Sequence, residues 1–440
     1  MSTAAPPQPQ QYSAHSSHDR TLPTTTAVEP PGGVRAWLVW AVAVGVYFLA
    51  MFHRNGLGVA ALEAQERFQV GPALLSALPV MQLVVYLVLQ MPAGLLADRL
   101  GPRRTLLMGL LAMVAGVVLF AVAPNIHVAI AARVLIGAGD AVTFLNVLRL
   151  GALWFPRSQY ALVSAFTGMI GGLGQVASVV PLSAALRGLG WTAAFLGAGA
   201  VTAVMVLLVL LVVRDRPAGM RDGHARKPLP VWASLVEAAK ARGSRVGMAN
   251  HIVMQAPYTM LAALWGYPFL VAGMGFAPAA AGLVLTVLGV ATLWTSPVIG
   301  ALIGRRPGVR KPTVLVSAVL LSLGWIALVA WPGGPPPAPV VVAHLACCSA
   351  AMMMAAPLSF DFARDGVPAH RTGVAAGLVN MSGFLAVVLT TVGAGLILEA
   401  LPEPPSGPAF QLAFLPVAAT TVAAALVLIV QLWRYPRVRR

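Results

Sequence analysis

Apolar runs of about 20 residues recur along the whole 440-residue chain, and each is long enough to cross a bilayer as a helix. Backbone groups in lipid must form hydrogen bonds within the protein, which favours helices over open strands. Hydrophobic residues make up 58% of the chain and charged residues only 10%, against roughly 25% in a typical soluble domain. The sequence therefore predicts an all-α polytopic membrane protein with twelve spans, at residues 36–60, 73–97, 105–123, 128–154, 159–184, 191–213, 246–272, 279–303, 312–331, 339–362, 373–398 and 410–433.

A polar segment at 214–245 separates the first six spans from the last six. We therefore predict an N-terminal six-helix bundle at 36–213 and a C-terminal one at 246–433. Within the polar segment, apolar residues recur at helical spacing and predict a short amphipathic helix on the inner membrane face. Residues 1–35 are rich in Pro, Gln, Ser and Thr and predict a disordered cytoplasmic tail, without the apolar core of a signal peptide. Residues 434–440 form a second, basic cytoplasmic tail.

The net charge of +16 is distributed asymmetrically over the predicted loops. When both termini are placed inside, the outer loops hold only two basic residues, Arg67 and Arg187. This asymmetry follows the positive-inside rule, so the basic charge indicates topology and does not point to nucleic acid. Arginine far outnumbers lysine, as in GC-rich bacterial genomes, which favours a bacterial plasma (inner) membrane with both termini cytoplasmic.

A charged hairpin, GLLADRLGPRRT, follows span two and begins at Gly94. Glycine permits a tight turn there, and Arg99 and Arg103 are expected to hold the loop on the inner side. Asp98 is expected to pair with arginines or to cap a neighbouring helix N-terminus.

The hairpin resembles the signature between spans two and three of the major facilitator superfamily. The stretch RVLIGAG, from Arg133 in span four, resembles the second signature of that family. The resemblance covers about residues 36–433. It implies two pseudo-symmetric six-helix bundles around a substrate cavity, secondary active transport by alternating access, and mostly monomeric function.

The two halves carry traces of an internal repeat. A second hairpin, GALIGRRPGVRK, begins at Gly300 and aligns with the first. Alignment of the inner ends of spans four and ten places Arg149 over Asp361. We predict that these opposite charges form a salt bridge between bundles that helps to close the inner gate. The alternative is local pairing, of Arg149 with Asp98 and of Asp361 with Arg364.

Arg54 lies in the outer half of span one and shares a helix face with Tyr47. A guanidinium group in a membrane suits carboxylate or phosphate, so both residues are candidates for substrate binding. The stretch resembles the same region of the anion-symporter and organophosphate branches, although span seven lacks the partner arginine expected from the phosphate exchangers. The alternative is an arginine that snorkels to the outer surface. We expect the neighbouring His53 to pack on another face.

Arg133 and Asp140 are seven residues apart in span four and therefore share a face. Asp140 lies near the centre of the span and is the best candidate for a proton-coupling carboxylate, with Arg133 as the charge that tunes it. The alternative is a fixed ion pair between the two.

Polar stripes on two other spans also indicate a cavity. Gln82 and Tyr86 share a face of span two, and Gln255 and Tyr258 share one of span seven. Together with Gln175 in span five they are candidates for substrate binding. Hydrogen bonds between helices are the alternative.

The sequence lacks the residue patterns that several classes of function require. No GxxxxGK[ST] loop occurs, no His, Cys and acid cluster has metal-site spacing, and no nucleophile–base set is apparent, so we predict no cofactor, no metal site and no enzyme. Span five also lacks the Gly-Pro pair usual in the family's drug exporters. We predict a transporter that moves a small organic anion by proton symport or exchange. The alternatives are a proton-coupled drug or metabolite exporter, in which Asp140 is essential and Arg54 dispensable, and a transporter-like sensor.

Overall fold

A computed structural model describes residues 30, 32–217, 231–365, 372–402 and 404–434. Within these residues every regular element is a helix. The predicted tail at 1–35 and the basic tail at 434–440 lie almost wholly outside the described residues, as does much of the central polar segment. The predicted short helix in that segment is present as α9 (Val231–Lys240).

The helices divide at the central segment. The first half contains α1 (Val34–Asn55), α2 (Leu57–Phe68), α3 (Pro72–Leu100), α4 (Pro102–Val122), α5 (Ile126–Ala141), α6 (Thr143–Trp154), α7 (Arg157–Ala177) and α8 (Val180–Val212). The second half continues after α9 with α10 (Arg242–Met260), the π-helical turn η1 (Leu261–Trp265), α11 (Gly266–Pro268), the π-helical turn η2 (Phe269–Gly273), α12 (Pro278–Leu293), α13 (Thr295–Arg305), the 3-10 turn η3 (Pro307–Val309), α14 (Arg310–Ala330), α15 (Ala338–Met354), α16 (Ala356–Arg364), α17 (Thr372–Glu399), α18 (Gly407–Ala413) and α19 (Leu415–Trp433).

Nine stretches of described helix are long and apolar enough to cross a membrane. One of them, 162–212, holds two predicted spans. Gly190, with φ 75° and ψ 174°, breaks the helix inside α8 and separates the two spans. Two further spans, 242–273 and 278–305, are interrupted helices. The described helices thus supply the twelve predicted spans, with small shifts at their ends.

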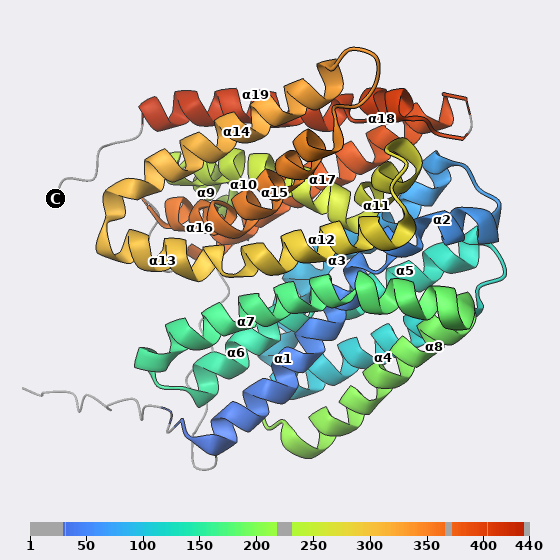
Figure 1. The fold of residues 1–440 in the computed structure, drawn as a ribbon. Coiled ribbons are helices and arrows are strands. Elements are labelled where there is room, and N and C mark those ends of the chain that lie inside the picture. Colours follow the sequence, from blue (N-terminus) through green and yellow to red (C-terminus); the bar gives the residue numbers. More distant parts are fainter. Residues whose placement is uncertain (1–29, 31, 218–230, 366–371, 403, 435–440) are drawn as a thin grey trace, which may run out of the picture.

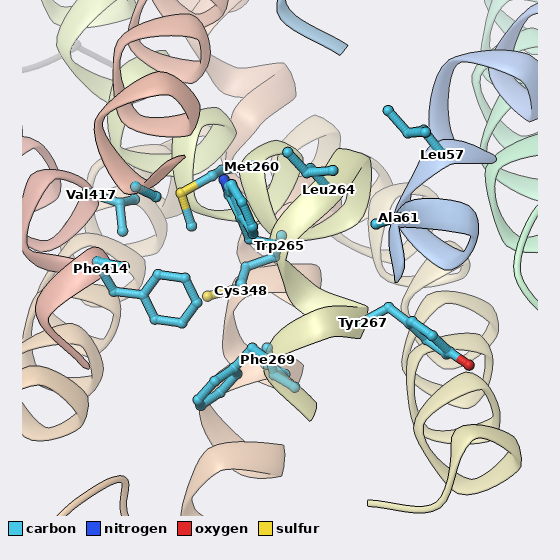
Figure 2. Packing of buried hydrophobic residues seen from close by; sticks show 14 of the residues in the cluster. Leu57, Ala61, Met260, Leu264, Trp265, Tyr267, Phe269, Cys348, Phe414 and Val417 are labelled. Atoms are coloured by element: carbon cyan, nitrogen blue, oxygen red, sulfur yellow. The ribbon is translucent and has the colours of Figure 1, made fainter. Parts of the chain in front are cut away.

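The two halves form two bundles that lie side by side (Figure 1). The most extensive described contacts between them are those of α3 with α17, of α7 with α12, and of α2 with η1 and α11. At the predicted outer end the last contact is very close, because a Cβ atom on Gly58 would lie 2.6 Å from the carbonyl oxygen of Ala262. Figure 2 shows Leu57 and Ala61 of α2 on one side of η1, with Phe414 and Val417 of the second bundle on the other. An apolar core therefore fills the bundle interface at its predicted outer end.

Proline explains several breaks in the helices. Pro257 and Pro268 remove backbone donors from span seven, which adopts two π-helical turns in this region. Pro357 follows the break between α15 and α16, where the amide of Asn250 donates to Ala355 O at 2.8 Å and to Ser359 Oγ at 2.7 Å. The breaks place unpaired backbone groups within the bundles, where polar side chains from neighbouring helices satisfy them.

The charged hairpin between α3 and α4 is held by an acid that lies far away in the sequence. Gly101 has φ 81°, and Asp215, which follows α8, accepts the backbone N–H of Arg103 at 2.7 Å. The Arg103 guanidinium donates to Leu210 O at 2.7 Å, while Arg99 is exposed. Capping by Asp98 stays a prediction, because its side chain lies outside the described ones. Asp215 serves as a cap for the α4 N-terminus.

Asp215→Ala is expected to lower the free energy of unfolding by about 1 kcal/mol, because it leaves a backbone donor at the α4 N-terminus without its partner. Thermal unfolding in detergent measures the effect. Asp215→Asn keeps one acceptor oxygen and serves as the matched control, with a smaller loss. Equal stability of Asp215→Ala and the wild type would contradict the capping role.

Candidate functional site

A buried ion pair joins span one to span four at the bundle interface. Arg54 Nε donates to Asp140 Oδ2 at 2.7 Å, and Arg54 Nη2 donates to Asp140 Oδ1 at 2.8 Å. This two-point geometry matches the planar guanidinium to the carboxylate. Asp140 reaches this place because it stands one residue before the end of α5, where Thr143 donates its hydroxyl to the Asp140 carbonyl at 2.8 Å.

The two side chains of this ion pair differ in how much of their surface is accessible to solvent. The side chain of Asp140 is completely covered, whereas 9% of the Arg54 side chain remains accessible. The second terminal nitrogen of Arg54, Nη1, forms no hydrogen bond with any side chain or backbone group that the structure describes. The small accessible area of the pair therefore belongs to the arginine.

Aromatic rings from both bundles cover Arg54. The guanidinium carbon lies 4.4 Å from the centroid of the Tyr86 ring on α3 and 5.6 Å from that of Phe384 on α17. The Tyr86 and Phe384 rings are 5.2 Å apart. Such cation–π contacts stabilise the charge when water is excluded, and they connect the ion pair to the second bundle. Sequence reasoning missed Phe384, because nothing marks one phenylalanine in an apolar span.

Arg133 does not pair with Asp140, and the predicted alternative of a fixed Arg133–Asp140 pair is wrong. Its Nη1 donates to His53 O and to Gln82 Oε1, each at 3.0 Å. Its guanidinium carbon lies 4.3 Å from the Phe120 ring centroid. The amide nitrogen of Gln82 lies toward the Asp140 carboxylate without a well-aligned hydrogen bond. Gln82 therefore sits between the two charged residues of span four.

A pocket lies between the bundles next to the ion pair. It contains about 650 Å³ of space free of atoms, its open side included. Its walls come from α1, α2, α7, span seven, α12 and α15, through Asn55, Gly58, Val59, Gln175, Val176, Val179, Tyr258, Leu261, Ala262, Tyr267, Leu285, Leu288, Gly289, Leu345, Cys348 and Ser349. Two of the predicted binding residues, Gln175 and Tyr258, thus share one pocket. They stand in opposite bundles, which is where a substrate cavity of this fold is expected.

The other predicted binding residues lie outside this pocket. Tyr47 is half-buried, and its ring packs 5.1 Å from Phe144. Gln255 is buried beside Gly383 of α17. Gln82 and Tyr86 face the charged residues described above, and whether any of these four contacts substrate stays a prediction.

The candidate gate residues lie on the expected helices. Arg149 is half-buried in α6 and Asp361 is half-buried in α16. A salt bridge between them stays a prediction. Sequence reasoning missed a second interaction of this region, in which Arg310 Nη2 contacts Asp365 Oδ2 at 3.1 Å within the second bundle. The available signal in the sequence was the pair of charges themselves: Arg310 is the first residue of α14, and Asp365 directly follows α16.

The chain belongs to the Major Facilitator Superfamily, whose sequence profile matches residues 43–391. The relatives that the chain matches in this family are named as transporters. The fold agrees with that of a bacterial homologue of the human lysosomal transporter Spinster in an inward-facing, unoccupied conformation. The TM-score is 0.70, with 16% identity over 91% of this chain and 96% of the other.

Three bacterial relatives differ in what their names say they carry. The chain is 24% identical over 189 residues to the probable sulfoacetate transporter of Cupriavidus necator, covering 43% of this chain. It is 25% identical over 360 residues to the probable actinorhodin transporter of Streptomyces coelicolor, covering 68%. It is 28% identical over 121 residues to the oxalate:formate antiporter of Oxalobacter formigenes, covering 28%. The matched parts span 43%, 62% and 29% of the relatives' own lengths, which is less than two thirds of each.

Proposed function

We propose that the protein transports an organic anion together with a proton, or exchanges one such anion for another, across a bacterial inner membrane in which both chain termini face the cytoplasm. The observation that carries this proposal is the buried two-point Arg54–Asp140 pair, in which only the arginine keeps a small accessible area. The names of two relatives, the sulfoacetate transporter and the oxalate:formate antiporter, support an anionic substrate.

The charges of the Arg54–Asp140 pair explain how anion binding is coupled to proton binding. In the empty site, Arg54 neutralises Asp140. An anion that binds Arg54 competes with Asp140, and a carboxylate left buried without its partner costs several kcal/mol. Protonation of Asp140 removes that cost and leaves Arg54 to neutralise the anion. One negative charge and one proton are then bound together, so the loaded site is no more charged than the empty one.

The aromatic contacts extend this scheme to alternating access. Arg54 belongs to the first bundle, and Phe384 of the second bundle lies against its guanidinium. A change of partner at Arg54 therefore alters a contact between bundles. We further propose that Arg149 and Asp361 pair at the inner gate when the bundles close there, which cysteine accessibility at the inner mouth of Asp361→Asn tests.

A proton-coupled exporter is the competing function, and the relative named as an actinorhodin transporter favours it. It predicts cationic or apolar ligands and a dispensable Arg54.

Arg54→Gln is expected to abolish the stabilisation of the protein by anions. The glutamine keeps hydrogen-bonding groups but lacks the charge that an anion needs. The measurement is thermal unfolding of purified protein in detergent with acetate, oxalate, sulfoacetate, benzoate, choline and glucose in turn. A ligand at about 100 times its Kd adds roughly 2.7 kcal/mol to the free energy of unfolding. Arg305→Gln, at an exposed arginine of α13, is the matched control and should respond like the wild type. Stabilisation of the Arg54→Gln variant by the same anions would refute the proposal.

A further inference from the structure

The pocket between the bundles has an apolar wall and a small polar corner. Apolar atoms form most of its surface, and its leucine and valine side chains come from both bundles. An apolar wall of this kind stabilises a ligand in proportion to the apolar area that the ligand removes from water.

Among the described residues that line the pocket, none carries a formal charge. Its polar side chains are amides, hydroxyls and a thiol. A charged group placed there would be desolvated without an opposite charge, which is strongly unfavourable. A small dianion therefore does not suit this pocket, even though it suits Arg54.

The polar corner consists of Gln175, Tyr258 and Ser349, with Tyr258 as its central residue. Gln175 of α7 and Ser349 of α15 line the pocket with it, and both side chains lie close enough to the phenol to act on it electrostatically. Gln175 belongs to the first bundle and Ser349 to the second, so both bundles contribute to the polar corner. A ligand with a hydroxyl or carbonyl group can form hydrogen bonds with these amide and hydroxyl groups.

The pocket and the Arg54–Asp140 pair lie at the same depth of span one. Asn55 lines the pocket, and Arg54 precedes it in α1, where consecutive side chains point about 100° apart. The two sites therefore lie on different faces of the same turn of α1, on the order of one helix diameter, roughly 10 Å, apart. A molecule the size of a substituted aromatic ring spans this distance.

We propose that the transported anion is an amphipathic monoanion: its single acidic group binds Arg54, its apolar or aromatic body fills the pocket, and a distal hydroxyl or carbonyl group binds the Gln175–Tyr258–Ser349 corner. This assignment rests on the proposed anion function and deepens it. It makes Tyr258 a specificity-determining residue.

A ligand series tests the assignment on the full-length protein in detergent, with Kd taken from the concentration dependence of thermal stabilisation. The series is acetate, phenylacetate, 4-hydroxyphenylacetate, oxalate and the neutral 2-(4-hydroxyphenyl)ethanol. Burial of the phenyl ring is expected to lower Kd at least about tenfold from acetate to phenylacetate. The hydroxyl group is expected to lower it about three- to tenfold further.

Variants then separate the two parts of the pocket. In Tyr258→Phe, the ratio of Kd between phenylacetate and 4-hydroxyphenylacetate should fall to about one, because the corner loses its central hydroxyl. Val179→Phe fills the apolar wall and should remove the preference for phenylacetate over acetate. Tyr160→Phe is the matched control, since this tyrosine of α7 does not line the pocket, and both ratios should be unchanged.

The outcomes distinguish this inference from the proposed function. If oxalate binds as tightly as 4-hydroxyphenylacetate and both need Arg54, the anion function stands and the amphipathic assignment is wrong. If the neutral alcohol binds as tightly as the acid, or if Arg54→Gln binds the acids like the wild type, the anion function itself fails. An unchanged hydroxyl ratio in Tyr258→Phe overturns the role of the polar corner.

Discussion

Asp140→Asn is expected to lower the free energy of unfolding by about 3–5 kcal/mol, the usual effect of removing one partner from a buried ion pair. Arg54 would then lie buried against Tyr86 and Phe384 without a negative charge. The double variant Arg54→Gln/Asp140→Asn removes both charges, so its loss should be clearly smaller than the sum of the two single losses.

A double-mutant cycle on chemical or thermal unfolding in detergent measures this coupling. Arg54→Gln with Asp361→Asn is a suitable control, because Asp361 lies in α16 and forms no described contact with Arg54. The two effects in that control should add. Additive effects in the Arg54 and Asp140 cycle as well would show that the pair contributes nothing to the folded state.

Gly139→Ala is expected to destabilise the first bundle by about 1–3 kcal/mol or more, the range for an overpacked core. A Cβ atom at this position would lie 2.3 Å from the carbonyl oxygen of Gly109 and 2.5 Å from Cγ of Met113, both on α4. The backbone oxygen cannot move without separating α4 from α5. The shift would also displace Asp140, the next residue.

Gly197→Ala is the matched control for that substitution. Gly197 is a helical glycine of span six, and no atom lies within 4 Å of a Cβ added there. Alanine is favoured over glycine in a helix by roughly 0.5–1 kcal/mol, so this variant should be as stable as the wild type or slightly more stable. The measurement is the unfolding temperature of both variants in the same detergent. Equal behaviour of the two would show that α4 and α5 do not pack as closely as described.

The spans could be predicted because each depends only on local composition and length. The bilayer requires about 20 apolar residues in each helix, and this requirement is visible in the sequence alone. The second family signature also has a local cause. Gly137 and Gly139 both face backbone oxygens, at Gln82 and Gly109, where a side chain would not fit.

The partners of the charged residues could not be predicted in the same way. Helical spacing places Arg133 and Asp140 on one face, but it says nothing of which neighbouring helix supplies the closer charge. Arg54 on another span is that charge, and Arg133 instead satisfies the carbonyl of His53. Arg54 and Asp140 were both identified as functional candidates, but their pairing depends on the packing of α1 against α5.

Span seven shows a second limit of helical spacing. Polar residues at 251, 255, 258 and 265 fall on one face of a straight α-helix. The π-helical turn at Leu261–Trp265 changes the number of residues per turn, so the stripe does not continue beyond it. Tyr258 lines the pocket, whereas the Trp265 indole donates to Thr391 O at 3.1 Å in α17. Pro257 and Pro268 were the available signals of this irregularity.

Measurement of proton uptake on anion binding tests most directly whether the Arg54–Asp140 pair couples an anion to a proton. Purified protein in a weakly buffered detergent solution is mixed with 4-hydroxyphenylacetate, and with acetate as a second probe, while a pH indicator records proton exchange. We expect uptake of about one proton for each anion bound by the wild type, because Asp140 must be neutralised when Arg54 changes partner. In Asp140→Asn we expect anion binding without proton uptake. No proton uptake by the wild type despite saturating binding, or the same uptake in Asp140→Asn, would contradict the claim that the Arg54–Asp140 pair couples anion to proton.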